Sequence, residues 1–529
     1  MVMTQEDNYM EHGNYGAKPG ARDTQNNLNR TLKSRHMSMI AVGGTIGTGL
    51  FVASGGVLSE AGPAGALVAY SLMGLIVFFV MTSLAEMSTF IPVAGSFNSF
   101  ADRFVDPAFG FAVGYNYWYS WITAAATDLV AAGIIMEFWL PNVNTVVWSF
   151  ALMAIIIFLN LFGAKLYGEA EFWLALIKVL AIVIFIIIGI LVASGIVGGT
   201  KYGFSNWKIE GAPFVNGFPG VLNVFVTAAF SFQGTEIVGV TTGESSNPSR
   251  DVPKAIRSIF WRILMFYILS IFLIGLIIPY TSPDLLNSDI GSIAISPLVV
   301  VLEKSGIKSA SHIMNAIILS SVLSAGNSGL YLTTRTLYSL AVEKKLFRSF
   351  KQVSRGGTPI YCLALCSLSV IILFCLSLIG NQVIYNWLVA FSGIAGLISW
   401  IGISFTHWRF RRAYHIQGYS LDDLPYKAAL YPFGPFFAFF ALIFITLAQG
   451  YQTVIISEGD KFNISDFFQA YIGIPIFLIL YIGYKVIKKT KLVNLTEMDL
   501  ETDSYISLGF PSCRDDKKPF YKNILDIFT

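Results

Sequence analysis

The sequence predicts an all-α polytopic membrane protein with twelve transmembrane helices. Helices 1–5 and 6–10 are expected to form a five-plus-five inverted repeat, followed by helices 11 and 12. Apolar runs of about 20 residues, enough to cross a bilayer, recur along almost the whole chain. Only 13% of the 529 residues are charged, about half the share in a soluble domain, and mean hydropathy is +0.63. Glycine-rich interruptions in the first and sixth runs predict the repeat.

Hydropathy places the twelve spans along a single helical domain over 37–488. Repeat 1 covers about 37–196, repeat 2 about 218–406, and the last two helices about 432–488. A polar tail over 1–36, without a cleavable signal sequence, precedes this domain, and a mixed polar tail over 489–529 follows it. The expected spans are 37–58, 64–91, 108–139, 146–165, 171–196, 218–241, 259–281, 310–338, 361–380, 384–406, 432–455 and 467–487.

Lysine and arginine are unevenly shared between the alternate loops of this topology. Close to the expected spans, twenty-one of them lie in or beside one set of loops, and five lie in the other. Because basic loops stay on the cytoplasmic side, this bias predicts a multi-pass protein of the plasma membrane with both termini in the cytoplasm.

Composition argues against several other classes of protein. The net charge of +3 is too near balance to suggest a nucleic-acid partner, and there is no phosphate-binding or haem-attachment motif. Three of the four cysteines lie in or near one apolar run, where small buried side chains are the simplest interpretation. We expect no enzyme activity, no metal and no cofactor.

The two interruptions are Gly43–Gly49, which reads GGTIGTG, and Phe230–Glu236, which reads FSFQGTE. Glycine frees backbone amides and carbonyls that lipid cannot satisfy, so such breaks are tolerated only inside protein or beside a wet cavity. Span 1 enters from the cytoplasm and span 6 from outside, so their breaks meet near the midplane with opposite directions. Paired breaks of this kind indicate the substrate site of a transporter.

Five segments resemble the amino acid–polyamine–organocation superfamily, and within it the amino acid transporter family. The resemblance covers about 36–490, and within the family it is strongest to bacterial lysine permeases, through Asn116–Trp121, Gly168–Lys178 and Leu323–Tyr331. The family segments, in order, are His36–Val42 with the glycine run after it, Ser231–Glu236, Gly243–Ser245, Val252–Arg257 and Ser324–Ser328.

The resemblance implies a LeuT-like fold with an amino acid at the breaks. A helix that begins at the first break offers free N–H groups and a positive dipole end, which suit a carboxylate. In similar transporters the substrate carboxylate lies on the residues that match Gly47, Thr48 and Gly49. The α-ammonium lies on carbonyls around Thr45 and in the second break, and Phe230 resembles the aromatic gate. The alternative is that the glycines only permit close helix packing.

Ionisable residues deep in a membrane are functional candidates. Tyr117, Trp121 and Asp128 are spaced by four and seven residues, so they share one face of span 3. Two aromatic rings beside a carboxylate suit a long cationic side chain. Glu236 could meet a lysine ε-ammonium, or serve as a general site or proton-coupling residue. Packing alone is the alternative for the two aromatic residues.

Lys178 in span 5 bears on energy coupling. The resemblance implies that its ammonium takes the place of the sodium ion that related carriers hold between spans 1 and 8. A desolvated lysine can also release its proton, so we expect Lys178 to serve proton coupling without sodium. The alternative is a structural ion pair with a neighbouring acid.

Two further charged features lie near the cytoplasmic face. Glu86 in span 2 is expected to pair with a basic loop residue or to cap a helix. The run Arg409, Arg411 and Arg412 after span 10 is interpreted as a topology anchor that faces anionic lipid.

These features together predict a secondary active transporter that imports L-lysine, or another cationic amino acid, with protons by alternating access. Its expected partners are the amino acid, protons and membrane lipid, and no nucleic acid. A broader cationic or general amino acid permease or exchanger is the first alternative. An amino acid sensor with little transport is the second.

Overall fold

The computed structural model describes residue 32 and the ranges 34–44, 46–93, 95–283, 296–306, 309–451 and 464–509. Helices dominate these residues, and the one β-bridge among them joins Leu32 to Ser245. The all-α expectation is therefore confirmed. In the first half, the helices and short helical turns are α1 (Ser34–Gly43), η1 (Gly49–Ala53), α2 (Ser54–Phe90), α3 (Ser96–Phe104), α4 (Pro107–Glu137), α5 (Thr145–Leu161), α6 (Ala164–Ala193) and η2 (Ser205–Trp207).

The remaining elements follow in the same pattern of long helices and short turns. They are α7 (Gly217–Phe232), α8 (Ile237–Thr241), η3 (Thr242–Glu244), α9 (Pro248–Arg262), η4 (Ile263–Ile268), α10 (Leu269–Ile277), α12 (Pro297–Glu303), α13 (Ala310–Val342), η6 (Arg348–Lys351), α14 (Ile360–Cys375), η7 (Leu376–Leu378), α15 (Asn381–Ile416), η8 (Leu421–Asp423), α16 (Phe433–Ala448), α18 (Ile464–Tyr471) and α19 (Gly473–Lys488).

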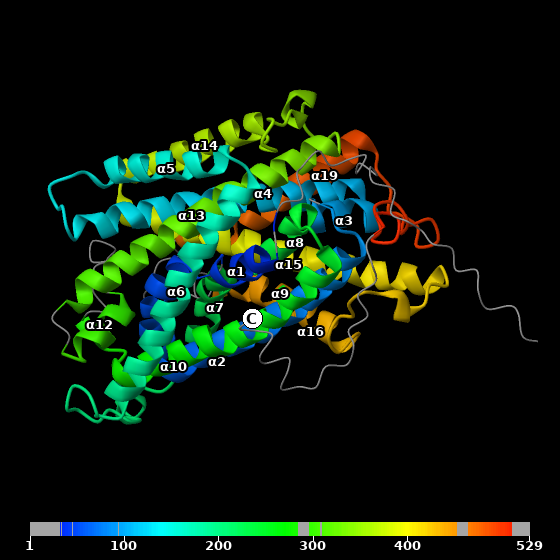
Figure 1. Ribbon diagram of the computed structural model, residues 1–529. Coiled ribbons are helices and arrows are strands. Elements are labelled where there is room, and N and C mark those ends of the chain that lie inside the picture. The colour runs from blue at the N-terminus through cyan, green and yellow to red at the C-terminus, as the bar shows by residue number, and fades with distance from the viewer. Residues whose placement is uncertain are drawn as a thin grey trace, which may run out of the picture.

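Seven helical stretches among the described residues are long and apolar enough to cross a membrane, and three shorter helices are also apolar. The described helices overlap each expected span, while the count of twelve and the inverted repeat stay predictions. Figure 1 shows α4 and α13 side by side through the bundle, with α5 and α14 along one edge. All five residues of α8 are buried.

Two helix limits differ from those expected, and both matter for charged residues. Gly163 adopts φ +84° in the turn after α5, so α6 begins at Ala164 rather than near 171. Glu171 therefore lies two turns inside the helix. α15 continues to Ile416, beyond the expected end near 406, and carries the arginine run as part of the helix.

Both expected interruptions are present and lie against each other. α1 ends at Gly43 and η1 begins at Gly49, while α7 ends at Phe232 and α8 begins at Ile237. A Cβ atom built on Gly234 would lie 2.6 Å from the Gly44 carbonyl oxygen. One built on Gly49 would lie 2.5 Å from Ser231 Cα. The two breaks thus meet through backbone contacts that only glycine permits.

α2 is bent at Gly62, which adopts φ +73° just before Pro63. At the bend, Ala64 N–H donates to Pro213 O at 3.1 Å, and Val215 N–H donates to Ala61 O at 3.1 Å. The loop before α7 therefore satisfies backbone groups that the bend leaves open. The bend separates 49–61 from 63–90, where the sequence predicts the boundary between spans 1 and 2.

The chain after α19 covers the end of the bundle at which α1 begins, called the N-face below. Val493 N–H donates to Val105 O at 2.9 Å, and Tyr505 N–H donates to Phe90 O at 2.8 Å. In Figure 1 this red segment lies beside α3. Asp106 caps α4 there and accepts from Lys485 and Thr490. Burial raises the pKa of Asp106, but these hydrogen bonds and one from Ala108 N–H outweigh burial, so the pKa is lowered.

Replacing Gly234 with alanine should destabilise the junction of the two breaks. The positive φ and the contact with Gly44 leave no room for a Cβ, so we expect a loss of about 1–3 kcal/mol in stability. The midpoint of thermal unfolding in detergent measures this loss. Gly56→Ala is the matched control, because no atom lies within 4 Å of its added Cβ. Equal midpoints for the two variants would contradict the assignment of a strained contact.

Candidate functional site

The first break leaves carbonyl groups inside the bundle, and side chains of two other helices satisfy them. Lys178 Nζ, from α6, donates to Gly43 O at 2.7 Å. Ser321 Oγ, from α13, donates to Ile46 O at 2.9 Å. Lys178 and Ser321 are fully buried. These contacts hold the interrupted helix against α6 and α13, so its released carbonyl groups have polar partners.

The second break is organised around the Glu236 carboxylate. Its Oε1 accepts from Gly234 N–H and from the Tyr117 hydroxyl, each at 3.3 Å, and its Oε2 accepts from Trp400 Nε1 at 3.3 Å. Gln233 Nε2 donates to Ser392 O at 2.6 Å, which fixes the start of the break to α15. Glu236 is 2% exposed. The carboxylate therefore connects α4, the break and α15.

A small pocket lies where the two breaks meet. Its volume is about 30 Å³, close to the share of one water molecule in the liquid. It must widen to admit an amino acid. The lining residues are Gly44, Gly47, Thr48, Gly49, Trp121, Ala124, Asp128, Phe230, Gln233 and Ala325.

Six of the site residues predicted from the sequence line this pocket together: Gly47, Thr48, Gly49, Trp121, Asp128 and Phe230. Thr48 Oγ1 donates to Asp128 Oδ1 at 3.1 Å, which ties the start of η1 to α4. Tyr117 and Glu236 are not lining residues. They are joined by their own hydrogen bond, while the Tyr117 and Trp121 rings have centroids 6.1 Å apart. Thr45 lies outside the described residues.

Lys178 contacts the first break through the Gly43 carbonyl but is not a lining residue of the pocket. Its Nζ lies 4.0 Å from Glu171 Oε1, and Glu171 Oε1 accepts from Ser324 Oγ at 2.6 Å. Both charged side chains are fully buried. Glu171 is a residue that the sequence reasoning missed, because the expected span began at that position. The spacing of seven residues between Glu171 and Lys178 on one helix is a signal that could have found it.

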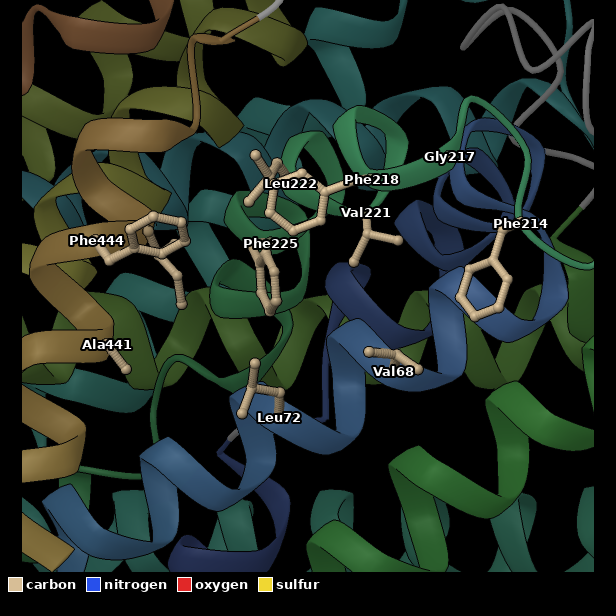
Figure 2. Close-up of a pocket in the computed structure, with 11 residues that line it drawn as sticks. Val68, Leu72, Phe214, Gly217, Phe218, Val221, Leu222, Phe225, Ala441 and Phe444 are labelled. Atoms are coloured by element: carbon tan, nitrogen blue, oxygen red, sulfur yellow. The ribbon is translucent and has the colours of Figure 1, made fainter. Parts of the chain in front are cut away.

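A larger groove lies elsewhere, between α2, α7 and α16. It encloses about 430 Å³ and is lined by apolar side chains, including Leu72, Phe225 and Phe444. Figure 2 shows these side chains converging with no charged residue among the labelled ones. A charged ligand would lose its hydration there without gaining polar partners. The groove is therefore unsuited to an amino acid.

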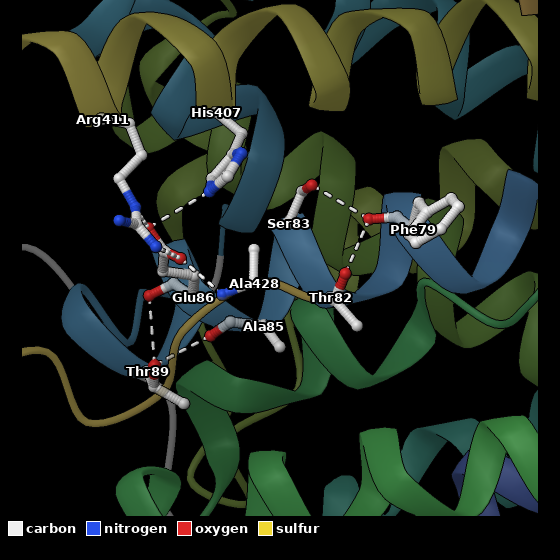
Figure 3. A network of polar contacts seen from close by, with 9 residues as sticks. All are labelled: Phe79, Thr82, Ser83, Ala85, Glu86, Thr89, His407, Arg411 and Ala428. Atoms are coloured by element: carbon white, nitrogen blue, oxygen red, sulfur yellow. Dashed lines mark hydrogen bonds and ion pairs between the residues drawn. The ribbon is translucent and has the colours of Figure 1, made fainter. Parts of the chain in front are cut away.

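Glu86 is the centre of a buried polar network near the N-face, shown in Figure 3. Both of its carboxylate oxygens accept from the Arg411 guanidinium, with Arg411 Nη2 at 2.6 Å from Oε2. Ala428 N–H donates to Oε2 at 2.6 Å, and His407 Nε2 lies 3.2 Å from Oε1. The expected basic partner of Glu86 is present, but Arg411 lies on α15 rather than in a loop.

The interpretation of the arginine run as a lipid-facing anchor is wrong for two of its members. Arg411 is buried against Glu86, and Arg409 is buried and donates to Phe104 O at 2.7 Å. Arg412 instead stacks over the Trp408 ring, 5.2 Å from its centroid. The helix carries these residues past the expected span end, so they meet partners inside the protein.

A helical bundle with several apolar spans, two interrupted helices in contact and a small pocket at their junction is typical of a multi-pass membrane protein with a buried break in its helices. The family model described as amino acid permease matches residues 36–497, so the chain belongs to the amino acid permease family. It is therefore a permease rather than an enzyme.

Three curated relatives are similar over nearly the whole chain. The lysine-specific permease LysP of Escherichia coli (strain K12) is 47% identical over 89% of this chain and 96% of its own length. LysP of Lactococcus lactis subsp. cremoris (strain MG1363) is 46% identical over 90% and 94%. The histidine permease HisP of the same strain is 44% identical over 91% and 100%.

Replacing Glu86 with glutamine should weaken the fold. The change leaves the buried Arg411 without its counter-ion, which we expect to cost about 3–5 kcal/mol of stability. Thermal unfolding in detergent measures the effect. Asp422→Asn is the control, because Asp422 forms its ion pair with Lys427 in the open, where such pairs contribute little. If the two variants have the same midpoint of thermal unfolding, Glu86 is not the buried partner of Arg411 described above.

Proposed function

We propose that this permease imports L-lysine across the plasma membrane, coupled to protons, by alternating access. The observation that carries the proposal is the charge pattern at the pocket. Gly47–Gly49 at the start of a helix and Asp128 line it, and Glu236 is bound to the second break through Gly234 N–H. Lysine carries one carboxylate and two ammonium groups. One positive helix end and two carboxylates match that set.

The proposed binding mode gives each charged group of the substrate a partner. The substrate carboxylate meets the amides of Gly47, Thr48 and Gly49, which have no acceptor within their own helix. The α-ammonium meets backbone carbonyls of the breaks, around Thr45 and Gly234. The side-chain ammonium meets a carboxylate, with Trp121 and Phe230 against its alkyl stem. Tyr117 orients Glu236 through its hydroxyl.

Lys178 is proposed to carry the coupling proton, with no sodium ion required. Its ammonium donates to the Gly43 carbonyl at the first break, so its charge acts directly on the helix that receives the substrate. A buried amine loses much of the hydration that stabilises its charged form, which favours release of the proton. The ion pair with Glu171 alone, without proton transfer, is the structural alternative.

In the proposed topology the N-face is cytoplasmic, together with both termini. The basic loops expected on the cytoplasmic side include those that carry Lys345, Arg409 and Lys485, and these residues lie at the N-face. Membrane lipid surrounds the apolar helix surfaces, including the groove between α2, α7 and α16.

A broader cationic amino acid permease is the second candidate. The 44% identity to a protein named a histidine permease, close to the identity to the two lysine permeases, favours a wider choice of substrate. Competition by arginine, ornithine and histidine against labelled lysine separates the two candidates.

The direct test is uptake of labelled lysine by proteoliposomes with an imposed pH gradient, with and without sodium. We expect accumulation that follows the pH gradient and does not change when choline replaces sodium. A sodium requirement, or binding without flux, would rule out proton-coupled import.

Glu236→Gln should lower lysine affinity by about two orders of magnitude or more, because a buried ammonium then loses its counter-charge at a cost of about 3–5 kcal/mol. Isothermal titration in detergent measures this loss. The exposed Asp422→Asn change is the control and should bind normally. Unchanged affinity in Glu236→Gln would remove Glu236 from the site.

A further inference from the structure

A second buried carboxylate, that of Glu171, lies near Lys178 and outside the lining of the pocket. Lys178 interacts electrostatically with both Glu171 and Asp128, and all three side chains are buried. Asp128 lines the pocket, whereas Glu171 is not one of its lining residues. Lys178 thus has one neighbouring acid that lines the pocket and one that does not.

The surroundings of Glu171 are polar and only partly satisfied. Oε1 accepts from Ser324, whereas Oε2 has no hydrogen-bond partner within 3.5 Å among the residues that the structure describes. Asn327 and Ser328, on the next turn of α13, also lie beside this carboxyl. Asn327 Oδ1 accepts from Asn160 at 2.9 Å, which leaves its Nδ2 amide group as a possible donor toward the Glu171 carboxyl. Hydroxyl and amide groups around a buried carboxyl can hydrogen-bond either of its protonation states.

Polar groups continue from Glu171 to the N-face. The Ser328 and Tyr167 hydroxyls are 3.1 Å apart, and the Tyr167 ring stacks on the Tyr331 ring with centroids 3.9 Å apart. The Tyr331 hydroxyl donates to Glu244 at 2.6 Å. Glu244 also pairs with Arg335 at 2.9 Å and lies next to the loop that binds Leu32.

We propose that Glu171 is the proton acceptor of Lys178 on the N-face side, a role that rests on the proton-coupled function proposed above. An N–H bond of the Lys178 ammonium breaks and an O–H bond forms on the Glu171 carboxylate. A neutral amine and a neutral acid result. The proton then leaves Glu171 for water at the N-face, and the amine regains a proton from the side of Asp128 and the pocket.

Geometry sets one requirement on this step. The 4.0 Å separation between Lys178 Nζ and Glu171 Oε1 exceeds hydrogen-bond reach, so the groups must approach or share one water molecule. The charged and titratable groups around Glu171 are Lys178 and Tyr167 from α6, Tyr331 and Arg335 from α13, Glu244 from η3, and Asp128 beyond Lys178. His36, from α1, pairs instead with Glu169.

Glu171→Gln separates proton coupling from substrate binding. The variant should keep lysine affinity and lysine–lysine exchange in proteoliposomes, because Glu171 does not line the pocket. Accumulation under a pH gradient of one unit should fall about tenfold, since that gradient is worth one factor of ten per coupled proton. Glu169→Gln, two residues away and partly exposed, is the control and should accumulate lysine normally.

Ser324→Ala keeps the acid and removes its hydrogen bond, so it tests the proposal even if Glu171→Gln fails to fold. We expect the pH profile of uptake to shift while affinity for lysine stays the same. If lysine accumulation by the wild-type protein does not depend on the pH gradient, the proposed function is wrong, whatever the result for Glu171→Gln. If wild-type uptake follows the gradient and the Glu171→Gln variant accumulates lysine equally, or the Ser324→Ala profile is unmoved, Glu171 is not the acceptor.

Discussion

Carbonyl groups released within the membrane-spanning bundle are the constraint on which the rest of this structure depends. Lipid cannot hydrogen-bond them, so protein must do so. Lys178 meets the Gly43 carbonyl and Ser321 meets the Ile46 carbonyl. Because these partners come from α6 and α13, both helices must lie against the first break. The pocket forms at that junction, where α7 and its own break approach through Gly234 and Gly49.

Ion pairs are distributed unevenly along the bundle. Apart from the Lys178–Glu171 pair, those found among the described residues join elements at the N-face: Arg335 to Glu244, Arg411 to Glu86, Lys345 to Asp102 and Arg103 to Asp503, among others. Several are buried, and separating a buried pair is costly. Ion pairs between elements therefore fasten the N-face. In the alternating-access cycle proposed above, opening that face would require compensation from the bound solute and proton.

Local patterns in the sequence predicted much of this structure, and tertiary contacts account for what they missed. Hydropathy and glycine content are properties of a single segment of sequence. The helical class and both interruptions could therefore be predicted from the sequence alone. The spacing of Trp121 and Asp128 placed both at the pocket, but Tyr117 turns to Glu236, a partner from another helix. The roles of Glu171 and Arg411 depend on where α6 begins and α15 ends, and on which helices face them.

The position of Lys178 limits how a cation at the first break can couple to transport. A free metal ion could leave with the substrate, but a lysine side chain is tethered to α6 and only its proton can depart. The Gly43 carbonyl accepts a hydrogen bond from the ammonium but is far too weakly basic to take the proton. The groups that can accept it are the carboxylates of Asp128 and Glu171, which flank Lys178. In the proposed mechanism, transfer from the pocket side to the N-face side therefore gives the coupling its direction.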